Sequence, residues 1–224
     1  EEGIDKIKEL GIRFVRIPLD KNGLSAAADI KYMIALTNLL KAEKPDITLG
    51  YTIKPVIYGA IAAKLAGVKN INSMVTGVGY VFTAETIKAK VIRTIASILY
   101  RIGFKCADTV IFQNQDDLKE FVERKLLKRE KCKLVNGSGV NMQKFELSPL
   151  PKKLTFFMLS RVMHSKGIRE YLHAAKEVKG KYPGVRFMLL GAVENIQDSM
   201  TMEDLSPYIN NGIIDYYGET NDVA

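Results

Sequence analysis

Short apolar runs alternate along the chain with longer segments in which apolar residues recur at helical spacing. Runs rich in Val and Ile between turn residues predict strands, and apolar residues three and four positions apart predict amphipathic helices. In the first two thirds of the chain the expected strands are 12–19, 47–52, 70–75, 107–114 and a short one near 132, and the expected helices are 27–44, 54–67, 86–104 and 115–127. The stripe expected to face the core in the helix at 27–44 consists of Ile30, Met33, Ile34 and Thr37.

The segment 147–153 (LSPLPKK) has two prolines and no periodicity, which makes it a candidate linker. After it the alternation resumes, with strands expected at 154–161, 185–191 and 212–218, a helix at 166–178 and a short helical or irregular piece at 203–212. Continuous apolar strands separated by helices indicate parallel sheets covered on both faces. The predicted fold class is therefore α/β, with two doubly wound, Rossmann-like domains at 1–148 and 149–224. We expect ligands beyond the carboxyl ends of the strands.

The composition is that of a globular protein, since the 224 residues are 47% hydrophobic and 26% charged. No apolar run approaches the ~20 residues needed to cross a bilayer. Cys106 and Cys132 lack the spacing of a zinc site or a disulfide framework. His164 and His173 are nine positions apart, a spacing that does not favour one helix face. We therefore predict no metal site and a reduced, cytoplasmic environment.

The net charge of +8 lies in the first 150 residues, because residues 151–224 hold nine basic and nine acidic side chains. Residues 86–144 alone, with 13 basic and 6 acidic side chains, carry +7. Such a regional excess attracts an anionic partner, for which nucleic acid, a phosphorylated substrate and an anionic membrane all qualify. Solubility alone is the alternative explanation.

The loop after the strand at 154–161 contains two cations, Arg161 and Lys166, five positions apart. Arg161 ends the strand and Lys166 lies where the next helix begins, so both should converge on one point. An arginine fork, a lysine ammonium and the free N–H groups of a helix end together suit a diphosphate. The alternative is a solvated turn with two unrelated charges.

Two glycine-containing loops are further candidates. Thr76, Gly77 and Gly79 follow the strand at 70–75, where glycines allow the backbone to approach a ligand closely. Gly139 and Asn141 belong to NGSGVN, just before the linker, where they could form an interdomain hinge. Tight turns explain either loop equally well.

The helix at 86–104 carries an apolar stripe of Ile87, Val91, Ile95, Ile98 and Ile102. Lys90, Arg93, Thr94, Ser97 and Arg101 lie on the opposite side, without an acidic residue among them. This pattern suits an anionic membrane surface. The alternative is an ordinary helix whose apolar stripe packs into the core.

Several runs together resemble family 4 glycosyltransferases of the bacterial subgroup that builds capsule, lipopolysaccharide and other surface polysaccharides. They are KPDITLGYTIKPVIYGAIAAKLAGV, VTGVGYVF, NGSGVNMQKF, FFMLSRVMHSKGIREYL, YPGVRFMLLG and IIDYYGET. The resemblance implies a GT-B fold, in which two Rossmann-like domains face each other across a cleft. It also implies that both domains are incomplete here, with the first strand expected before Glu1 and a pair of donor-binding glutamates expected after Ala224.

The resemblance further implies transfer of a sugar from a nucleotide-sugar, UDP-linked in the simplest case, to a lipid-linked saccharide acceptor. Such enzymes usually retain the anomeric configuration and use neither a metal nor another cofactor. Arg161 and Lys166 would bind the donor diphosphate, and Gly191 would lie near the nucleotide. Thr76, Gly77 and Gly79 would border the acceptor, and Gly139 and Asn141 the hinge. No catalytic base or nucleophile is assigned.

A lipid-linked acceptor implies peripheral attachment to the inner face of the cytoplasmic membrane and no role for nucleic acid. Two alternatives remain open. One is a nucleotide-sugar 2-epimerase of similar architecture, for which the sequence offers no convincing set of acid and base residues. The other is a polyanion-binding module that uses residues 86–144, although the aromatic residues there do not interleave with the charges as stacking platforms do.

Overall fold

The computed structural model describes residues 2–20, 25–77, 87–145, 147–195 and 198–220. The chain divides into two compact units, Glu1–Gly139 and Val140–Ala224. The division falls directly after Gly139 of the NGSGVN loop. This position precedes the proline-containing segment 147–153, which was predicted as the linker. Each unit has its own hydrophobic core.

The first unit is built on a parallel sheet with the order β1-β2-β3-β4. The strands are β1 (Ile47–Tyr51), β2 (Asn70–Val75), β3 (Thr109–Phe112) and β4 (Cys132–Leu134). The helices are α1 (Glu2–Glu9), α2 (Ala26–Glu43), the π-helix η1 (Pro55–Gly59), α3 (Ala60–Ala66), α5 (Ile87–Cys106), α6 (Gln115–Glu123) and the short 3-10 helix η2 (Arg129–Lys131). Because all the strand pairs are parallel, the carboxyl ends of the strands share one edge.

The second unit has a parallel sheet with the order β5-β6-β7. Its strands are β5 (Thr155–Leu159), β6 (Arg186–Leu190) and β7 (Asp215–Tyr216), and its helices are the 3-10 helix η3 (His164–Lys166), α7 (Ile168–Lys181) and α8 (Met202–Asn210). The piece expected at 203–212 is therefore a helix, which begins with a capping box between Thr201 and Asp204. The prediction of two parallel α/β sheets is confirmed.

Local signals in the sequence explain most helix boundaries. The side chain of Ser25 accepts a hydrogen bond from the Ala28 amide and caps α2. Asn114 caps α6 in the same way. Gly67 ends α3 in the left-handed conformation, with φ 81°, which a glycine adopts without a Cβ clash.

Aromatic residues dominate the core of the first unit. Tyr100 and Phe104 of α5 lie with their ring centroids 5.2 Å apart, and Phe121 of α6 meets Tyr100 edge-on at 5.0 Å. Phe112 of β3 contacts Phe121 at 5.5 Å. These edge-to-face and offset contacts fix α5 and α6 against the sheet.

Three predictions about the elements are wrong. Residues 12–19 form no strand, because no strand of the described residues pairs with them and their apolar side chains are largely exposed. The stripe of α2 is displaced: Thr37 is buried as predicted, but Ile30 and Ile34 are exposed, and Asp29 and Tyr32 are buried instead.

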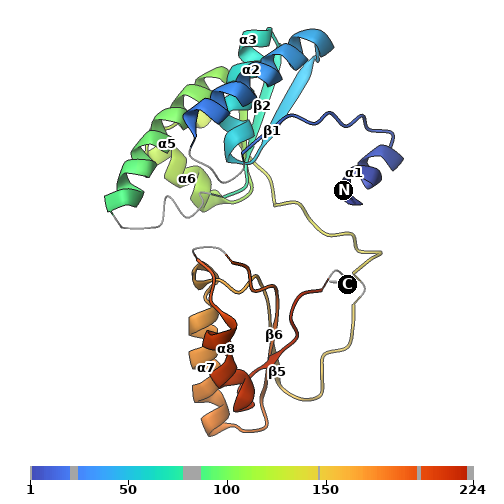
Figure 1. Ribbon diagram of the computed structural model, residues 1–224, viewed down its shortest axis with the longest axis vertical. Coiled ribbons are helices and arrows are strands. Elements are labelled where there is room, and N and C mark those ends of the chain that lie inside the picture. Colours follow the sequence, from blue (N-terminus) through green and yellow to red (C-terminus); the bar gives the residue numbers. More distant parts are fainter. Residues whose placement is uncertain (1, 21–24, 78–86, 146, 196–197, 221–224) are drawn as a thin grey trace. The chain divides into compact units, whose positions relative to one another are not determined.

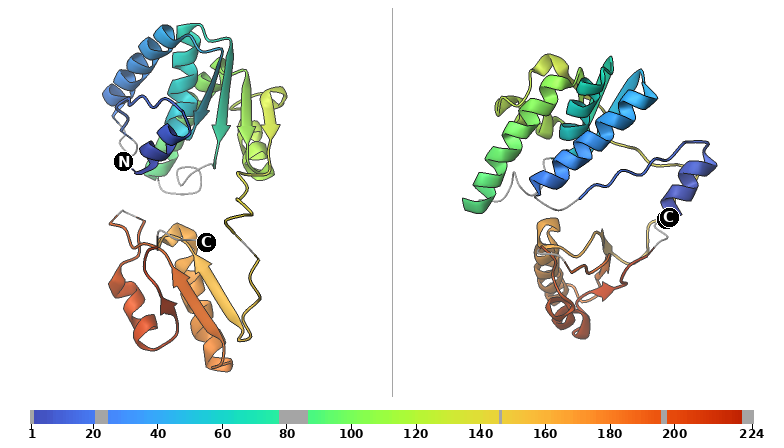
Figure 2. Two further views of the ribbon diagram at one scale, coloured as in Figure 1. Left: turned by 90° about the vertical axis from the view of Figure 1, so that its right-hand side faces the viewer. Right: turned by 45° about the horizontal axis from the view of Figure 1, so that its top comes forward.

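The third wrong prediction concerns the coverage of the two faces of each sheet. Among the described residues, α2, α3, α5 and α6 lie on one side of the first sheet, and α7 and α8 on one side of the second, as Figures 1 and 2 show for each unit. Apolar side chains on the opposite side are exposed, including Leu49 of β1 and Phe157 of β5. The prediction that both faces are covered is therefore wrong for this part of the chain.

Candidate functional site

The carboxyl edge of the β5-β6-β7 sheet holds Arg161, Gly191 and Glu194. Arg161 lies two residues beyond the end of β5, and Gly191 directly follows β6. They line a hollow of about 300 Å³ together with Leu159, Ser160, Leu190, Ala192, Glu194, Glu219 and Thr220. This position matches the place where ligands bind on open parallel sheets.

Arg161 is held by a carboxylate that the sequence analysis did not single out. Its Nη1 lies 3.2 Å from Oε2 of Glu194, and the two side chains are 54% and 36% exposed. Lys166 ends η3, two residues before α7 begins. Within the described residues it has no ion-pair partner. Both cations therefore lie in the loop between β5 and α7, and Lys166 is exposed.

Hydrogen bonds to Ala192 and Asp198, which both follow β6, hold this loop in place. The amide of Val162 donates to the carbonyl of Ala192 at 2.9 Å, and the amide of His164 to the carbonyl of Asp198 at 2.9 Å. The carboxylate of Asp198 accepts hydrogen bonds from the amide and hydroxyl of Ser165. The loop that carries both cations is thus pinned by backbone contacts from a second segment.

At Gly191 the segment after β6 lies very close to the segment after β5. A Cβ atom there would lie 1.8 Å from the carbonyl oxygen of Ser160, so no side chain fits. The hydroxyl of Tyr216 donates to the Gly191 carbonyl at 2.8 Å, and burial, with the nearby Glu219, raises the pKa of Tyr216, which keeps it a donor. The glycine therefore allows the floor of the hollow to form.

The carboxyl edge of the first sheet holds Thr76 and Gly77, directly after β2. A Cβ atom at Gly77 would meet no atom of the described residues within 4 Å. Gly79 lies outside the described residues. Two of the three acceptor candidates, Thr76 and Gly77, therefore lie at the strand ends, where ligands of this fold class bind.

A buried ionic cluster lies close to the same edge and was missed from the sequence. Lys54 Nζ, in the turn after β1, lies 2.6 Å from Oδ1 of Asp29 in the first turn of α2, and only 12% and 10% of these side chains are exposed. Burial and a hydrogen bond to Asp29 raise the pKa of Tyr58 to about 12. A lysine beside a proline that starts a helix was the available signal, but its partner is 25 positions away.

The NGSGVN loop is irregular. Gly139 has φ 67°, in the left-handed region that favours glycine, and it is the last residue of the first unit. The side chain of Asn141 accepts a hydrogen bond from the Gln143 amide at 2.9 Å. Ser138 is tied to the end of β3 through Gln113 at 3.1 Å.

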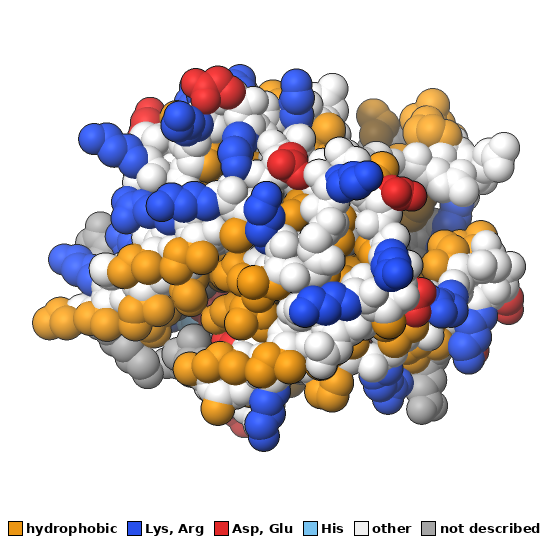
Figure 3. All heavy atoms as spheres, turned by 90° about the horizontal axis from the view of Figure 1, so that it is seen from above, with side chains coloured by type: hydrophobic (Ala, Val, Ile, Leu, Met, Phe, Trp, Pro, Cys, Tyr) orange, Lys and Arg blue, Asp and Glu red, His pale blue; other side chains and the backbone are white. Residues whose placement is uncertain are grey.

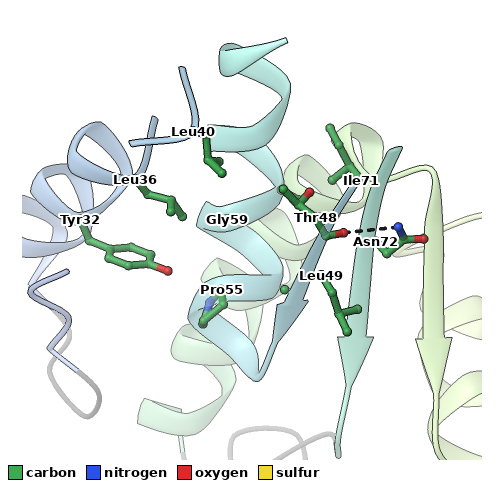
Figure 4. Close-up of a pocket in the computed structure, with 11 residues that line it drawn as sticks. Tyr32, Leu36, Leu40, Thr48, Leu49, Pro55, Gly59, Ile71 and Asn72 are labelled. Atoms are coloured by element: carbon green, nitrogen blue, oxygen red, sulfur yellow. Dashed lines mark hydrogen bonds between the residues drawn. The ribbon is translucent and has the colours of Figure 1, made fainter. Parts of the chain in front are cut away.

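A separate, mostly apolar cavity of about 230 Å³ lies between α2, β1 and η1 (Figure 4). Tyr32, Leu36 and Leu40 line it from α2, and Thr48 and Leu49 from β1. The backbone carbonyl of Thr48 accepts a hydrogen bond from Asn72 at 3.3 Å. None of the predicted site residues borders this cavity.

Helix α5 presents its isoleucine and valine stripe to solvent. Ile87 is 83% exposed, and Val91, Ile95, Ile98 and Ile102 are each close to half exposed. The face that packs into the core instead carries Ala96, Tyr100 and Phe104. Core packing of the stripe, the alternative left open from the sequence, is therefore wrong. Figure 3 shows apolar side chains beside Lys and Arg at the left of the molecule, where α5 lies in Figure 1.

Part of the basic excess has a structural role. Arg101 donates through Nε and Nη2 to the carbonyls of Lys125 and Arg124, just after α6. Lys131 Nζ donates to the carbonyls of Phe104 and Ala107, at the end of α5, at 2.9 and 2.5 Å. Cations at a helix C-terminus satisfy its free carbonyls and its dipole. These residues are therefore not available as a phosphate-binding array.

In the described part of the chain, His, Cys, Asp and Glu side chains form no cluster that could hold a metal ion. No helix found in the same residues has the length and hydrophobicity needed to span a bilayer.

Two curated relatives match the chain. One is the N,N'-diacetylbacillosaminyl-diphospho-undecaprenol alpha-1,3-N-acetylgalactosaminyltransferase of Campylobacter jejuni, 25% identical over 238 residues, which cover 100% of this chain and 61% of the relative. The other is the UDP-Gal:alpha-D-GlcNAc-diphosphoundecaprenol alpha-1,3-galactosyltransferase of Escherichia coli, 27% identical over 201 residues, 84% of this chain and 51% of the relative. The chain thus spans between half and two thirds of the length of each.

Among solved structures, the sucrose-phosphate synthase of Thermosynechococcus elongatus has a TM-score of 0.69 at 18% identity, over 93% of this chain and 54% of that chain. The glycosyltransferase of Rickettsia africae has a TM-score of 0.67 at 15% identity, over 98% and 58%. These likenesses confirm the predicted GT-B type of fold. A family model described as glycosyl transferase 4-like matches residues 1–114. Because this match covers half of the 224 residues, the chain belongs to the glycosyl transferase 4-like family.

Proposed function

We propose that the protein transfers a sugar from a nucleotide-sugar, UDP-linked in the simplest case, to a lipid-linked saccharide in the synthesis of a surface polysaccharide. The observation that carries the proposal is Arg161 in the lining of an open hollow at the carboxyl edge of the β5-β6-β7 sheet. Lys166 does not line the hollow, but it lies exposed in the same connection between β5 and α7. The names of both curated relatives describe sugar transfer to a diphosphoundecaprenol-linked saccharide. The same acceptor class is proposed here.

In the proposed reaction an acceptor hydroxyl oxygen forms a new bond to the sugar carbon and releases its proton to water. The bond between that carbon and the diphosphate oxygen breaks, and the nucleoside diphosphate leaves with the additional negative charge. Arg161 and Lys166 stabilise that charge as it develops, in the way that positioned cations stabilise transition states in dry sites. Two cations aimed at the leaving group perform the task that a metal ion performs elsewhere. We therefore propose a metal-independent reaction that retains the anomeric configuration and needs no further cofactor.

The acceptor is proposed to bind at the carboxyl edge of the first sheet, near Thr76, Gly77 and Gly79, with Gly139 and Asn141 forming the hinge. A lipid-linked acceptor requires the enzyme at the membrane. The exposed Ile and Val stripe of α5, with the basic Lys90 on the same helix, supports peripheral attachment to the anionic inner face of the cytoplasmic membrane. A polyanion-binding module is disfavoured, because Arg101 and Lys131 bind helix ends.

The donor site is tested by Arg161→Ala and Lys166→Ala in the full-length protein. Each change removes one charge-assisted contact, which contributes about 1.5–3 kcal/mol. We expect kcat/KM for sugar transfer to fall roughly ten- to a hundredfold in each variant. Lys176→Ala, on the exposed side of α7, is the matched control and should keep the wild-type value. Wild-type kcat/KM in both test variants would overturn the assignment.

A further inference from the structure

We propose that the Glu194 carboxylate occupies the place of the donor diphosphate in the free protein, where it holds the Arg161 guanidinium, and that the incoming diphosphate displaces it. The inference rests on the proposed function and assigns Glu194 a positioning role at that site. Its ligand class is a nucleoside diphosphate or another diphosphate.

The first support is the contact itself. Arg161 Nη1 and Glu194 Oε2 lie 3.2 Å apart although the residues are 33 positions apart in the sequence. Both line the hollow at the strand ends. A guanidinium fork binds carboxylate and phosphate oxygens in the same geometry, so a carboxylate at this point offers Arg161 the contact that a phosphate would offer.

The second support is that the backbone on either side of the pair is fixed. Before Glu194, the Ala192 carbonyl accepts from the Val162 amide at 2.9 Å. After it, the Met200 amide donates to the Val162 carbonyl at 3.1 Å, and Ser199 forms a β-bridge with Met163. The two side chains can therefore separate by rotation alone, while the loop that carries Arg161 and Lys166 keeps its shape.

The balance of interactions favours the exchange. An ion pair between half-exposed side chains contributes little, because water screens it and both side chains lose rotational freedom. A diphosphate brings more than one negative charge and can accept hydrogen bonds from more than one N–H group of Arg161. Glu194 thus holds the Arg161 side chain at the hollow in the free protein. Because the ion pair is weak, a diphosphate displaces the Glu194 carboxylate readily. The cost is a lower affinity for the donor.

This role predicts the sign of a binding change. With Glu194→Gln the competing charge is gone, so inorganic pyrophosphate and UDP should both bind about three- to fivefold more tightly, the range of an exposed ion pair. Glu177→Gln is the matched control, since Glu177 is an exposed carboxylate of α7 that does not line the hollow. It should change either affinity by less than about twofold. Isothermal titration calorimetry on the full chain measures the affinity of the wild type and of both variants for each probe.

The double variant Arg161→Ala/Glu194→Gln completes the cycle. Without Arg161 the Glu194 change should lose most of its effect, because its partner is absent. Unchanged or weaker pyrophosphate binding in Glu194→Gln would overturn the exchange, as would an equal gain in Glu177→Gln. Tighter pyrophosphate but weaker UDP binding would instead make Glu194 a ligand of the nucleoside, and this also overturns it. If Arg161→Ala binds both probes like the wild type, the donor site itself fails, which is a distinguishable result.

Discussion

At the scale of single residues, Gly191 is the position where one added methyl group should disturb the donor site most directly. Gly191→Ala would place its Cβ 1.8 Å from the Ser160 carbonyl oxygen and force the strand ends apart. Overpacking of this kind costs about 1–3 kcal/mol. We expect the free energy of unfolding in urea, followed by circular dichroism, to fall by at least that amount.

Gly184→Ala provides the control for this change. A Cβ at Gly184 would meet no atom within 4 Å, and surface substitutions usually change stability by less than about 0.5 kcal/mol. Equal stability of the Gly191→Ala variant and the wild type would mean that the close approach of Gly191 to Ser160 does not exist in solution.

The residues that sequence reasoning could locate are those whose place follows from strand ends. Arg161, Gly77 and Gly191 each lie at or within two residues of the end of an apolar run, and the structure puts them at carboxyl edges. Glu194 could not be found in this way. It belongs to a loop without periodicity, and its significance comes from a partner 33 positions away. Pairing across loops depends on tertiary structure, which periodicity does not encode.

At the scale of elements, the Asp29–Lys54 pair joins the start of α2 to the turn before η1. Lys54→Met would leave the Asp29 carboxylate buried without its charged partner, which costs about 3–5 kcal/mol in buried pairs. We expect the free energy of unfolding of the first unit to fall by about 3 kcal/mol. The double variant Asp29→Leu/Lys54→Met should lose less than Lys54→Met alone, because no charge is left buried.

The exposed pair Lys8–Asp5, whose side chains are 63% and 70% exposed, is the reference for this experiment. Lys8→Met should change the free energy of unfolding by less than about 1 kcal/mol. Equal effects of Lys54→Met and Lys8→Met in urea unfolding would show that the Asp29–Lys54 contact is not buried.

The same pair explains why the elements were easier to predict than their faces. The bounds of α2 follow from Ser25 and from the helical period, but the apolar stripe leaves out Asp29, which is buried. In α5 the apolar positions outnumber those the core needs, so the largest stripe is not the buried one. Residues 12–19 have strand composition without a neighbouring strand in the described residues, and a lone strand leaves its backbone groups unpaired.

At the scale of the molecule, two α/β units were predicted because the segment 147–153, with two prolines and no periodicity, interrupts the alternation of strands and helices. The division lies between Gly139 and Val140, whereas prolines drew attention to 147–153. Leu147 and Leu150 are 96% and 91% exposed, so the segment after the division packs against little. Prolines show where regular secondary structure is interrupted. The boundary of a compact unit depends instead on tertiary contacts, and here these end at Gly139, before the prolines.

The proposed attachment of the whole molecule to the membrane can be tested by changing the exposed face of α5. Lys90→Glu reverses a charge on this helix, and Val91→Ser with Ile95→Ser removes two apolar side chains from its exposed stripe. A basic residue near an anionic surface contributes ~1 kcal/mol, so charge reversal should weaken vesicle binding roughly tenfold or more. Arg101 is left unchanged, because its contacts with the end of α6 would confuse the result. Co-sedimentation with vesicles of phosphatidylglycerol and phosphatidylcholine measures the binding.

Two control variants show whether the loss of vesicle binding is specific to α5 or follows from any loss of positive charge or exposed apolar surface. Lys181→Glu in α7 and Leu65→Ser in α3 alter exposed residues of the same kinds elsewhere and should bind like the wild type. Binding by the wild type should weaken in high salt, which shortens the screening length, and in vesicles of phosphatidylcholine alone. If the α5 variants bind as the controls do, or if binding ignores both salt and lipid charge, then α5 is not the attachment surface. Loss in the charge variant alone would mean that α5 rests on the headgroups, whereas loss in both means that its isoleucine stripe also enters the acyl boundary.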